Sequence, residues 1–170
     1  VADCKANGEE ILKAIHEMEK EHVKLMVFPE FCITGYTCHD LFLQRCLLDS
    51  AWDELLHIAE ETRETDALIF VGLPLRHRGK LYNVAAALNH GRIVGFVPKT
   101  HIPNYNEFYE QRQFAGAEEE DVEFVDFLKC EKNEEDEFWD EIPFGTELIF
   151  ECKEFPEFTV AAAVSYTHLR

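Results

Sequence analysis

Two hydrophobic periodicities alternate along the first seventy residues. Apolar residues recur at helical spacing over 8–21 and over 50–64, which predicts two amphipathic helices with acidic outer faces. Short continuous apolar runs at 25–28 and 67–72 are typical of strands buried on both faces. A helix that leads into such a strand predicts a βαβ unit whose first strand precedes residue 1.

The following residues predict an antiparallel meander, because turns that contain glycine separate their apolar runs. The turns are expected at 77–80 and 89–92, and the strands at 81–88 and 93–97. The predicted sheet is therefore mixed, parallel at its start and antiparallel afterwards. Further along the chain, we expect a turn at 143–146 and strands at 147–152 and 158–163, the strands being separated by Pro156.

Polar residues mark the expected helix starts. Asn7, with Glu10 three residues later, fits a capping box for the first helix. Asp40 is a suitable N-cap for a segment that begins at Leu41.

An acid and an amine follow two of the predicted strands directly. Glu30 comes after the apolar run that Pro29 ends, and Lys99 comes after the run that Pro98 ends. If these strands are neighbours in one sheet, the two side chains meet at its edge, where α/β proteins collect ligands. Such a pair serves either as a structural ion pair or as a general base beside an oxyanion-stabilising cation.

Four segments, in this order, resemble the nitrilase (carbon–nitrogen hydrolase) superfamily, in the form of the glutaminase domain of glutamine-dependent NAD synthetases. They are Phe28-Pro29-Glu30-Phe31-Cys32-Ile33-Thr34-Gly35-Tyr36-Thr37-Cys38-His39-Asp40-Leu41-Phe42, then Gly72-Leu73-Pro74 with Leu81-Tyr82-Asn83, then Pro98-Lys99 through Asn104-Tyr105-Asn106-Glu107-Phe108-Tyr109-Glu110, and then Pro143-Phe144-Gly145-Thr146. The resemblance implies an α/β fold, a four-layer αββα sandwich with mixed sheets, of which this chain is an incomplete part.

The resemblance also implies a Cys-Glu-Lys amidase that acts on glutamine. Glu30 matches the general base, Lys99 the oxyanion-stabilising lysine, and Glu107 a second glutamate that positions the site. Tyr105 matches a substrate-binding residue, and Tyr36 is expected to line the same pocket. A synthetase domain outside this chain is expected to use ATP and Mg²⁺ to make NAD, and the full-length enzyme is expected to be a homo-oligomer.

The nucleophilic cysteine of that family has no counterpart in the sequence. Ser165 falls near its position, but the flanking residues differ, and the tail from Val164 to Arg170 is similar to a cloning scar. Serine is a far weaker nucleophile than a thiolate. We therefore expect a partial glutaminase domain over 1–163, a non-native tail over 164–170, and no glutaminase activity in the chain by itself.

The net charge and the cysteine content indicate which classes of partner and which cellular location to expect. The formal net charge of −18 disfavours nucleic acid and anionic membranes as partners, and no apolar run is long enough to span a bilayer. Six cysteines without a secretory signal predict reduced thiols and a cytoplasmic location. Cys32, Cys38 and His39 lack the usual spacing of zinc ligands, so no metal is expected. The acid-rich segment 117–141 is expected to form a solvent-exposed loop on the surface, because clustered like charges repel one another.

Two alternatives to the synthetase fragment remain open from the sequence. One is a stand-alone nitrilase-like amidase, and the other is a non-catalytic acidic interaction module on the same fold.

Overall fold

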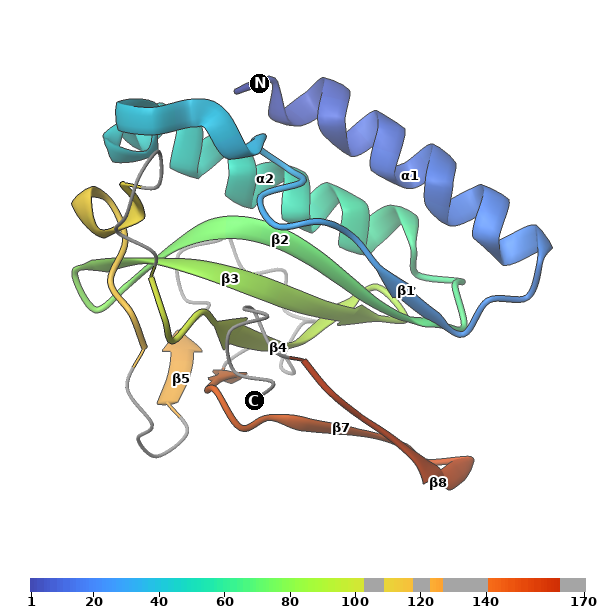
Figure 1. The fold of residues 1–170 in the computed structure, drawn as a ribbon. Helices are drawn as coiled ribbons and strands as arrows, with labels where there is room; N and C mark the ends of the chain where they lie inside the picture. The colour runs from blue at the N-terminus through green and yellow to red at the C-terminus, as the bar shows by residue number, and fades with distance from the viewer. Residues whose placement is uncertain (103–108, 118–122, 127–140, 163–170) are drawn as a thin grey trace.

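The computed structural model describes residues 1–102, 109–117, 123–126 and 141–162. Two helices cover one face of a six-stranded sheet, and a two-stranded hairpin lies below the other face (Figure 1). The elements of the helical side are α1 (Cys4–Lys20), η1 (Tyr36–Leu43), α2 (Arg45–Glu61) and η2 (Glu110–Arg112). The strands are β1 (Leu25–Val27), β2 (Leu68–His77), β3 (Lys80–Asn89), β4 (Arg92–Pro98), β5 (Glu123–Asp126), β6 (Glu141–Phe144), β7 (Ile149–Cys152) and β8 (Phe155–Ala161).

Both predicted helices are confirmed, but they begin earlier than the sequence indicates. The predicted cap at Asn7 is wrong, because Asp3 caps α1 by accepting a 3.1 Å hydrogen bond from the backbone N–H of Ala6. Asn7 lies inside the helix and donates instead to the Ile33 carbonyl at 2.9 Å. The predicted cap at Asp40 is also wrong, because that residue lies within η1.

The central sheet is mixed, as predicted, in the order β1-β2-β3-β4-β6-β5. β1 pairs in parallel with β2, and the meander β2-β3-β4 is antiparallel. The strands before Glu30 and Lys99 are therefore not neighbours, since β2 and β3 lie between β1 and β4. The expectation that adjacent strands bring the two residues together is wrong, and another feature of the fold has to do so.

The C-terminal strands differ in detail from the expectation. Pro143 and Phe144 belong to β6, which pairs in parallel with β4, so the predicted turn begins only after them. Pro156 lies inside β8 and does not separate two strands. β7 and β8 form an antiparallel hairpin. Edge strands of this kind tolerate a proline, because its missing N–H is not needed for strand pairing.

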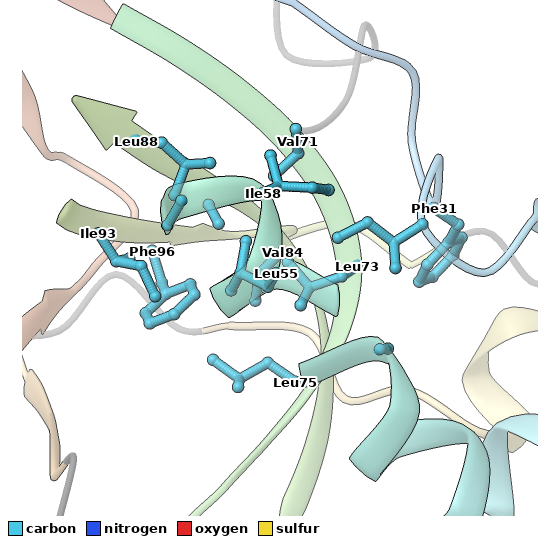
Figure 2. Close-up of a cluster of buried hydrophobic side chains, with 14 of the residues drawn as sticks. Phe31, Leu55, Ile58, Val71, Leu73, Leu75, Val84, Leu88, Ile93 and Phe96 are labelled. Carbon is cyan, nitrogen blue, oxygen red and sulfur yellow. The ribbon is translucent and has the colours of Figure 1, made fainter. Parts of the chain in front are cut away.

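The hydrophobic core lies between the helices and the central sheet. Leu55 and Ile58 of α2 face the sheet and are fully buried. Figure 2 shows them among side chains from β2, β3 and β4, including Val71, Val84 and Phe96. Burial of each such side chain is worth about 1.5–3 kcal/mol relative to exposure. This packing fixes α2 against the strands that carry the charged residues described below.

The opposite face of the sheet contacts the β7–β8 hairpin. The Phe150 ring of β7 meets the Phe70 ring of β2 edge-on, with centroids 5.3 Å apart. Gly95 of β4 has no side chain, and a Cβ there would lie 3.0 Å from Leu148 Cδ1. The described residues thus provide a helical layer, a six-stranded sheet and a two-stranded hairpin on its other face. None of the helices in the described ranges is long and apolar enough to cross a membrane.

Candidate active site

Three charged side chains from separate segments meet above the sheet. The Lys99 ammonium lies 2.8 Å from Glu30 Oε1 and 3.1 Å from Glu110 Oε2. The Lys99 and Glu110 side chains are 6% and 9% exposed, whereas the Glu30 side chain is 33% exposed and reaches the solvent side. The structure therefore brings Glu30 and Lys99 together, as the sequence predicts, and adds a carboxylate that the prediction did not include.

Gly72 of β2 explains how Glu30 reaches Lys99 from a distant strand. β1 and β4 are three strand positions apart, about 14 Å at a spacing of about 4.8 Å per strand. The turn after β1 folds over β2, and the Ile33 N–H donates to the Gly72 carbonyl at 3.3 Å. A Cβ at Gly72 would lie 2.6 Å from Phe31 N and 2.7 Å from Pro29 O, so this approach needs a glycine.

An aromatic cluster fixes the same turn from the other side. The Phe31 ring lies 4.8 Å from that of Phe42 in η1 and 5.0 Å from that of Phe114, which follows η2. The Phe42 and Phe114 rings also touch edge-on at 5.0 Å. All three are at least 95% buried, so the segments that carry the charged residues share one small apolar core.

Backbone hydrogen bonds hold Lys99 just beyond the end of β4. Its N–H donates to the Asn83 carbonyl of β3 at 2.8 Å, and its carbonyl accepts from the Ala117 N–H at 3.0 Å. The second bond depends on Gly116, because a Cβ at that position would lie 2.4 Å from the Thr100 carbonyl oxygen. Both flanking segments thus fix the starting point of the lysine side chain.

Glu110 is the first residue of η2 and is held by Tyr36 of η1. The Tyr36 hydroxyl donates to Glu110 Oε1 at 2.5 Å. Beside this bond, Arg112 donates twice to the Asp40 carboxylate, at 2.8 and 2.9 Å, and Gln113 donates to the same group at 3.0 Å. The Arg112 guanidinium keeps the pKa of Asp40 below its usual range, with a smaller effect from Gln113. This ion pair joins the two segments that carry Tyr36 and Glu110.

The other predicted site residues have different outcomes. Tyr36 lies at the site, but its expected contact with substrate stays a prediction. Glu107 and Tyr105 lie outside the described residues, and their roles also stay predictions. Ser165 lies outside them too.

The arrangement of charges suits amide chemistry. One ammonium stands between two carboxylates, which leaves a net charge of one negative in a largely buried place. A lysine ammonium has three N–H donors, and the two carboxylates engage two of them. Among the described residues no further side chain engages the third, which can therefore donate to an oxygen that becomes negative during a reaction. Of the two carboxylates, Glu30 is the more exposed, and a carboxylate in such a position can accept a proton from an incoming group.

Three of the described cysteines, Cys4, Cys32 and Cys38, are poorly suited to supply a nucleophile. Burial raises the pKa of the Cys32 thiol to about 11, although it lies only two residues from Glu30 in the sequence. Its sulfur accepts a 3.2 Å hydrogen bond from the Gly72 N–H. Burial likewise raises the pKa of Cys4 to about 11 and also raises that of Cys38. These thiols stay protonated near neutral pH and pack as small apolar groups.

No three His, Cys, Asp or Glu side chains of the described ranges are grouped as ligands for a metal ion. Cys38 is buried and its thiol hydrogen bonds to the Thr34 and Gly35 carbonyls at 3.3 Å, which is a structural role.

Asn83 and Glu110 are the site residues that sequence reasoning missed. Asn83 is the polar residue of an otherwise apolar run on β3, is fully buried, and donates from Nδ2 to Glu30 Oε1. An amide side chain within an apolar strand run is the signal that could have found it, because a buried polar group needs a partner. Glu110 and Glu107 lie in the same predicted loop segment, which begins at Asn104. Nothing in the sequence was a reason to prefer Glu110 as the second glutamate of the site.

Comparisons with known proteins show the family of this chain. The family model of carbon–nitrogen hydrolases matches residues 1–136. A glutamine-dependent NAD(+) synthetase of Mycobacterium bovis is 34% identical over 161 residues, which is 94% of this chain and 22% of the relative. That of Aquifex aeolicus is 39% identical over 123 residues, or 70% of this chain and 21% of the relative. The chain therefore spans about a fifth of the length of these curated relatives.

Solved structures show the same relationship. A glutamine-dependent NAD(+) synthetase from Cytophaga hutchinsonii superposes with a TM-score of 0.77 at 30% identity, covering 89% of this chain and 24% of that chain. An amidase of the nitrilase superfamily from Nesterenkonia AN1 gives a TM-score of 0.58 at 20% identity, covering 74% and 47%, and supports the fold alone. The family match over most of the sequence, on a fold that joins Glu30 to Lys99, shows that this chain belongs to the carbon–nitrogen hydrolase family.

Proposed function

We propose that this chain is the part of a glutaminase domain that supplies the base and the oxyanion donor for cleaving glutamine within a glutamine-dependent NAD synthetase. The observation that carries the proposal is the buried Lys99 ammonium held between Glu30 and Glu110, in a chain that is 34% and 39% identical to the two synthetases described above. A stand-alone amidase is less well supported, because the amidase neighbour shares 20% identity.

The proposed reaction uses a cysteine thiol from a part of the enzyme outside the described residues. Glu30 takes the thiol proton, and the sulfur attacks the side-chain amide carbon of glutamine. Lys99 donates a hydrogen bond to the oxygen that becomes negative. The tetrahedral intermediate expels ammonia, which carries the proton from Glu30. Water then attacks the thioester with Glu30 again acting as base, and the products are glutamate and the free thiol.

Glu110 has a supporting role in this proposal. Its carboxylate accepts from both Lys99 and Tyr36, so it holds the ammonium in place without contact to the reacting atoms. The roles proposed for Glu107 and Tyr105 rest on the resemblance of their segment. The ammonia would be used by a synthetase domain that requires ATP and Mg²⁺, and homo-oligomer formation and a cytoplasmic location also belong to the proposal.

The test compares this chain with a longer protein in which the same residues are followed by a cysteine-bearing glutaminase domain. Ammonia release from glutamine is measured with a coupled dehydrogenase assay. We expect no release above background from the chain alone, and release from the longer protein that falls at least a hundredfold on Glu30→Gln. Asparagine serves as the control substrate.

Two results would contradict the proposal. Ammonia release by the chain alone that disappears on Ser165→Ala would make Ser165 the nucleophile. A longer protein that is folded but releases no ammonia from glutamine would favour the non-catalytic module on this fold.

A further inference from the structure

The Asn83 side chain is the fully buried polar group that lies against the proposed base. It projects from β3, its residue exposure is 0%, and its Nδ2 donates to Glu30 Oε1. The other end of the same amide, Oδ1, is buried without a hydrogen-bond partner among the described residues. A buried unpaired carbonyl oxygen is unfavourable, so its persistence in a central strand needs an explanation.

The Glu30 carboxylate is held asymmetrically. Oε1 accepts from Asn83 Nδ2 and also from Lys99 Nζ at 2.8 Å. Within the described part of the chain, Oε2 accepts no hydrogen bond, and the side chain is 33% exposed. Among the described residues, Oε1 therefore has two donors and Oε2 has none, which leaves the lone pairs of Oε2 for an incoming group.

Asn83 also connects the base to the lysine through the backbone. Its carbonyl accepts the Lys99 N–H at 2.8 Å, while its side chain contacts Glu30. Across the sheet it pairs with Pro74 of β2, which has no N–H to offer. Asn83 thus lies on β3, one of the two strands that separate β1 from β4.

We propose that Asn83 is a positioning residue that fixes the Glu30 carboxylate so that Oε2, and not Oε1, accepts the proton of the nucleophile. This inference rests on the proposed function of Glu30 as general base. An amide is suited to this task, because it donates to the carboxylate without adding charge beside Lys99 and Glu110. The cost of placing a donor at this buried point is that Oδ1 has no hydrogen-bond partner among the described residues.

The kinetic test uses Asn83→Leu in the longer, cysteine-bearing protein, with Asn89→Leu as the matched control. Asn89 lies on the same strand, and its side chain donates to the Ala67 carbonyl at 3.0 Å, away from the site. We expect Asn83→Leu to lower kcat for glutamine at least tenfold with KM changed less than twofold. Asn89→Leu is expected to lower the melting temperature and to leave kcat within twofold of the unsubstituted protein.

A second variant keeps the test decisive if leucine does not fold at this position. Asn83→Asp has nearly the same shape but replaces the donor with another acceptor, and is expected to lower kcat at least as much. A folded variant at residue 83 with kcat within twofold of the unsubstituted protein would overturn the positioning role alone. An unsubstituted protein that releases no ammonia would instead overturn the proposed function.

The contact itself is tested in the 170-residue chain, by NMR of the Asn83 side-chain amide. We expect Glu30→Gln to shift these amide proton resonances, because the charged acceptor is lost, while Glu54→Gln on α2 leaves them in place. Identical resonances in both variants would show that Asn83 does not donate to Glu30, and would overturn the inference without reference to activity.

Discussion

At the scale of single residues, the site depends on the Lys99 ammonium, which forms ion pairs with two carboxylates. Lys99 is buried, and carboxylate oxygens of both Glu30 and Glu110 lie within 3.1 Å of its ammonium nitrogen. Without it, two carboxylates would face each other in a place that water reaches poorly. Removal of one member of a buried ion pair is costly because the remaining charge has no compensation.

We therefore predict that Lys99→Met destabilises the chain by about 3 kcal/mol or more. The matched control is Lys24→Met. The ion pair of Lys24 with Asp66 is also short, at 2.7 Å, but the two side chains are 61% and 74% exposed. An exposed pair contributes about 0–1 kcal/mol, so the control should change stability little. Urea unfolding followed by circular dichroism measures both.

Adding Glu110→Gln to Lys99→Met should restore part of the lost stability, because it removes one of the two carboxylates. Equal unfolding free energies for the Lys99 and Lys24 variants would contradict this account of the site.

At the scale of elements, the contact between α1 and α2 contains an unusual buried acid. Glu54 of α2 is 7% exposed, and its Oε1 has no partner among the described residues. It lies against Gly8 of α1, where a Cβ would be 1.7 Å from that oxygen. Burial is the main cause that raises the pKa of the Glu54 carboxyl, with nearby Glu9 adding to it and His57 and Lys5 opposing it.

A raised pKa means that the folded chain binds the proton of Glu54 more tightly than the unfolded chain does. The stability due to the neutral carboxyl is therefore fully present below the unfolded pKa, near 4.5, and is lost as the pH rises through the folded pKa. We predict that Glu54→Gln reduces this decline and makes the chain more stable than the parent at pH 7. Melting temperatures between pH 4 and pH 7 provide the measurement.

Glu17→Gln, at an exposed position of α1, is the control and should follow the pH profile of the unsubstituted chain. If the two glutamine variants have the same profile, the buried carboxyl of Glu54 is not the source of the pH dependence.

At the scale of the whole molecule, the β7–β8 hairpin exposes apolar side chains. Ile149, Phe155 and Phe158 are 72%, 60% and 41% exposed. In the described ranges β8 pairs with β7 alone, so one of its edges offers free backbone donors and acceptors. Such an edge, with exposed aromatic rings, is a site for association with another chain.

We predict that the chain self-associates in a concentration-dependent manner, and that Phe155→Lys with Phe158→Lys shifts it toward the monomer. Sedimentation velocity over a range of concentrations measures the change. Leu41→Lys with Leu43→Lys is the control, because these η1 residues are 48% and 49% exposed on the helical side. If this control reduces association and the hairpin variant does not, the hairpin is not the associating surface.

Local pattern determined most of the elements in the first hundred residues. Helices α1 and α2 could be predicted from their periodicity, and the turns at 77–80 and 89–92 from their glycines. Both signals depend only on residues that are close together in the sequence. The motifs around Glu30 and Lys99 identified the family and two of the charged residues of the site. Helix starts were less well predicted, because Asp3 and Asn7 are both good caps and a long-range bond from Asn7 to Ile33 decides between them.

Only the tertiary structure decided how the site is assembled. The sequence by itself named Glu30 and Lys99 but placed them on neighbouring strands, whereas the fold joins them across two intervening strands through a turn that Gly72 admits. It also selected Glu110 and Asn83, whose roles depend on contacts between residues 11 and 53 positions apart in the chain. Periodicity reports which residues are buried, but a hydrogen bond across a sheet depends on strand order and on close approach, which no local pattern encodes.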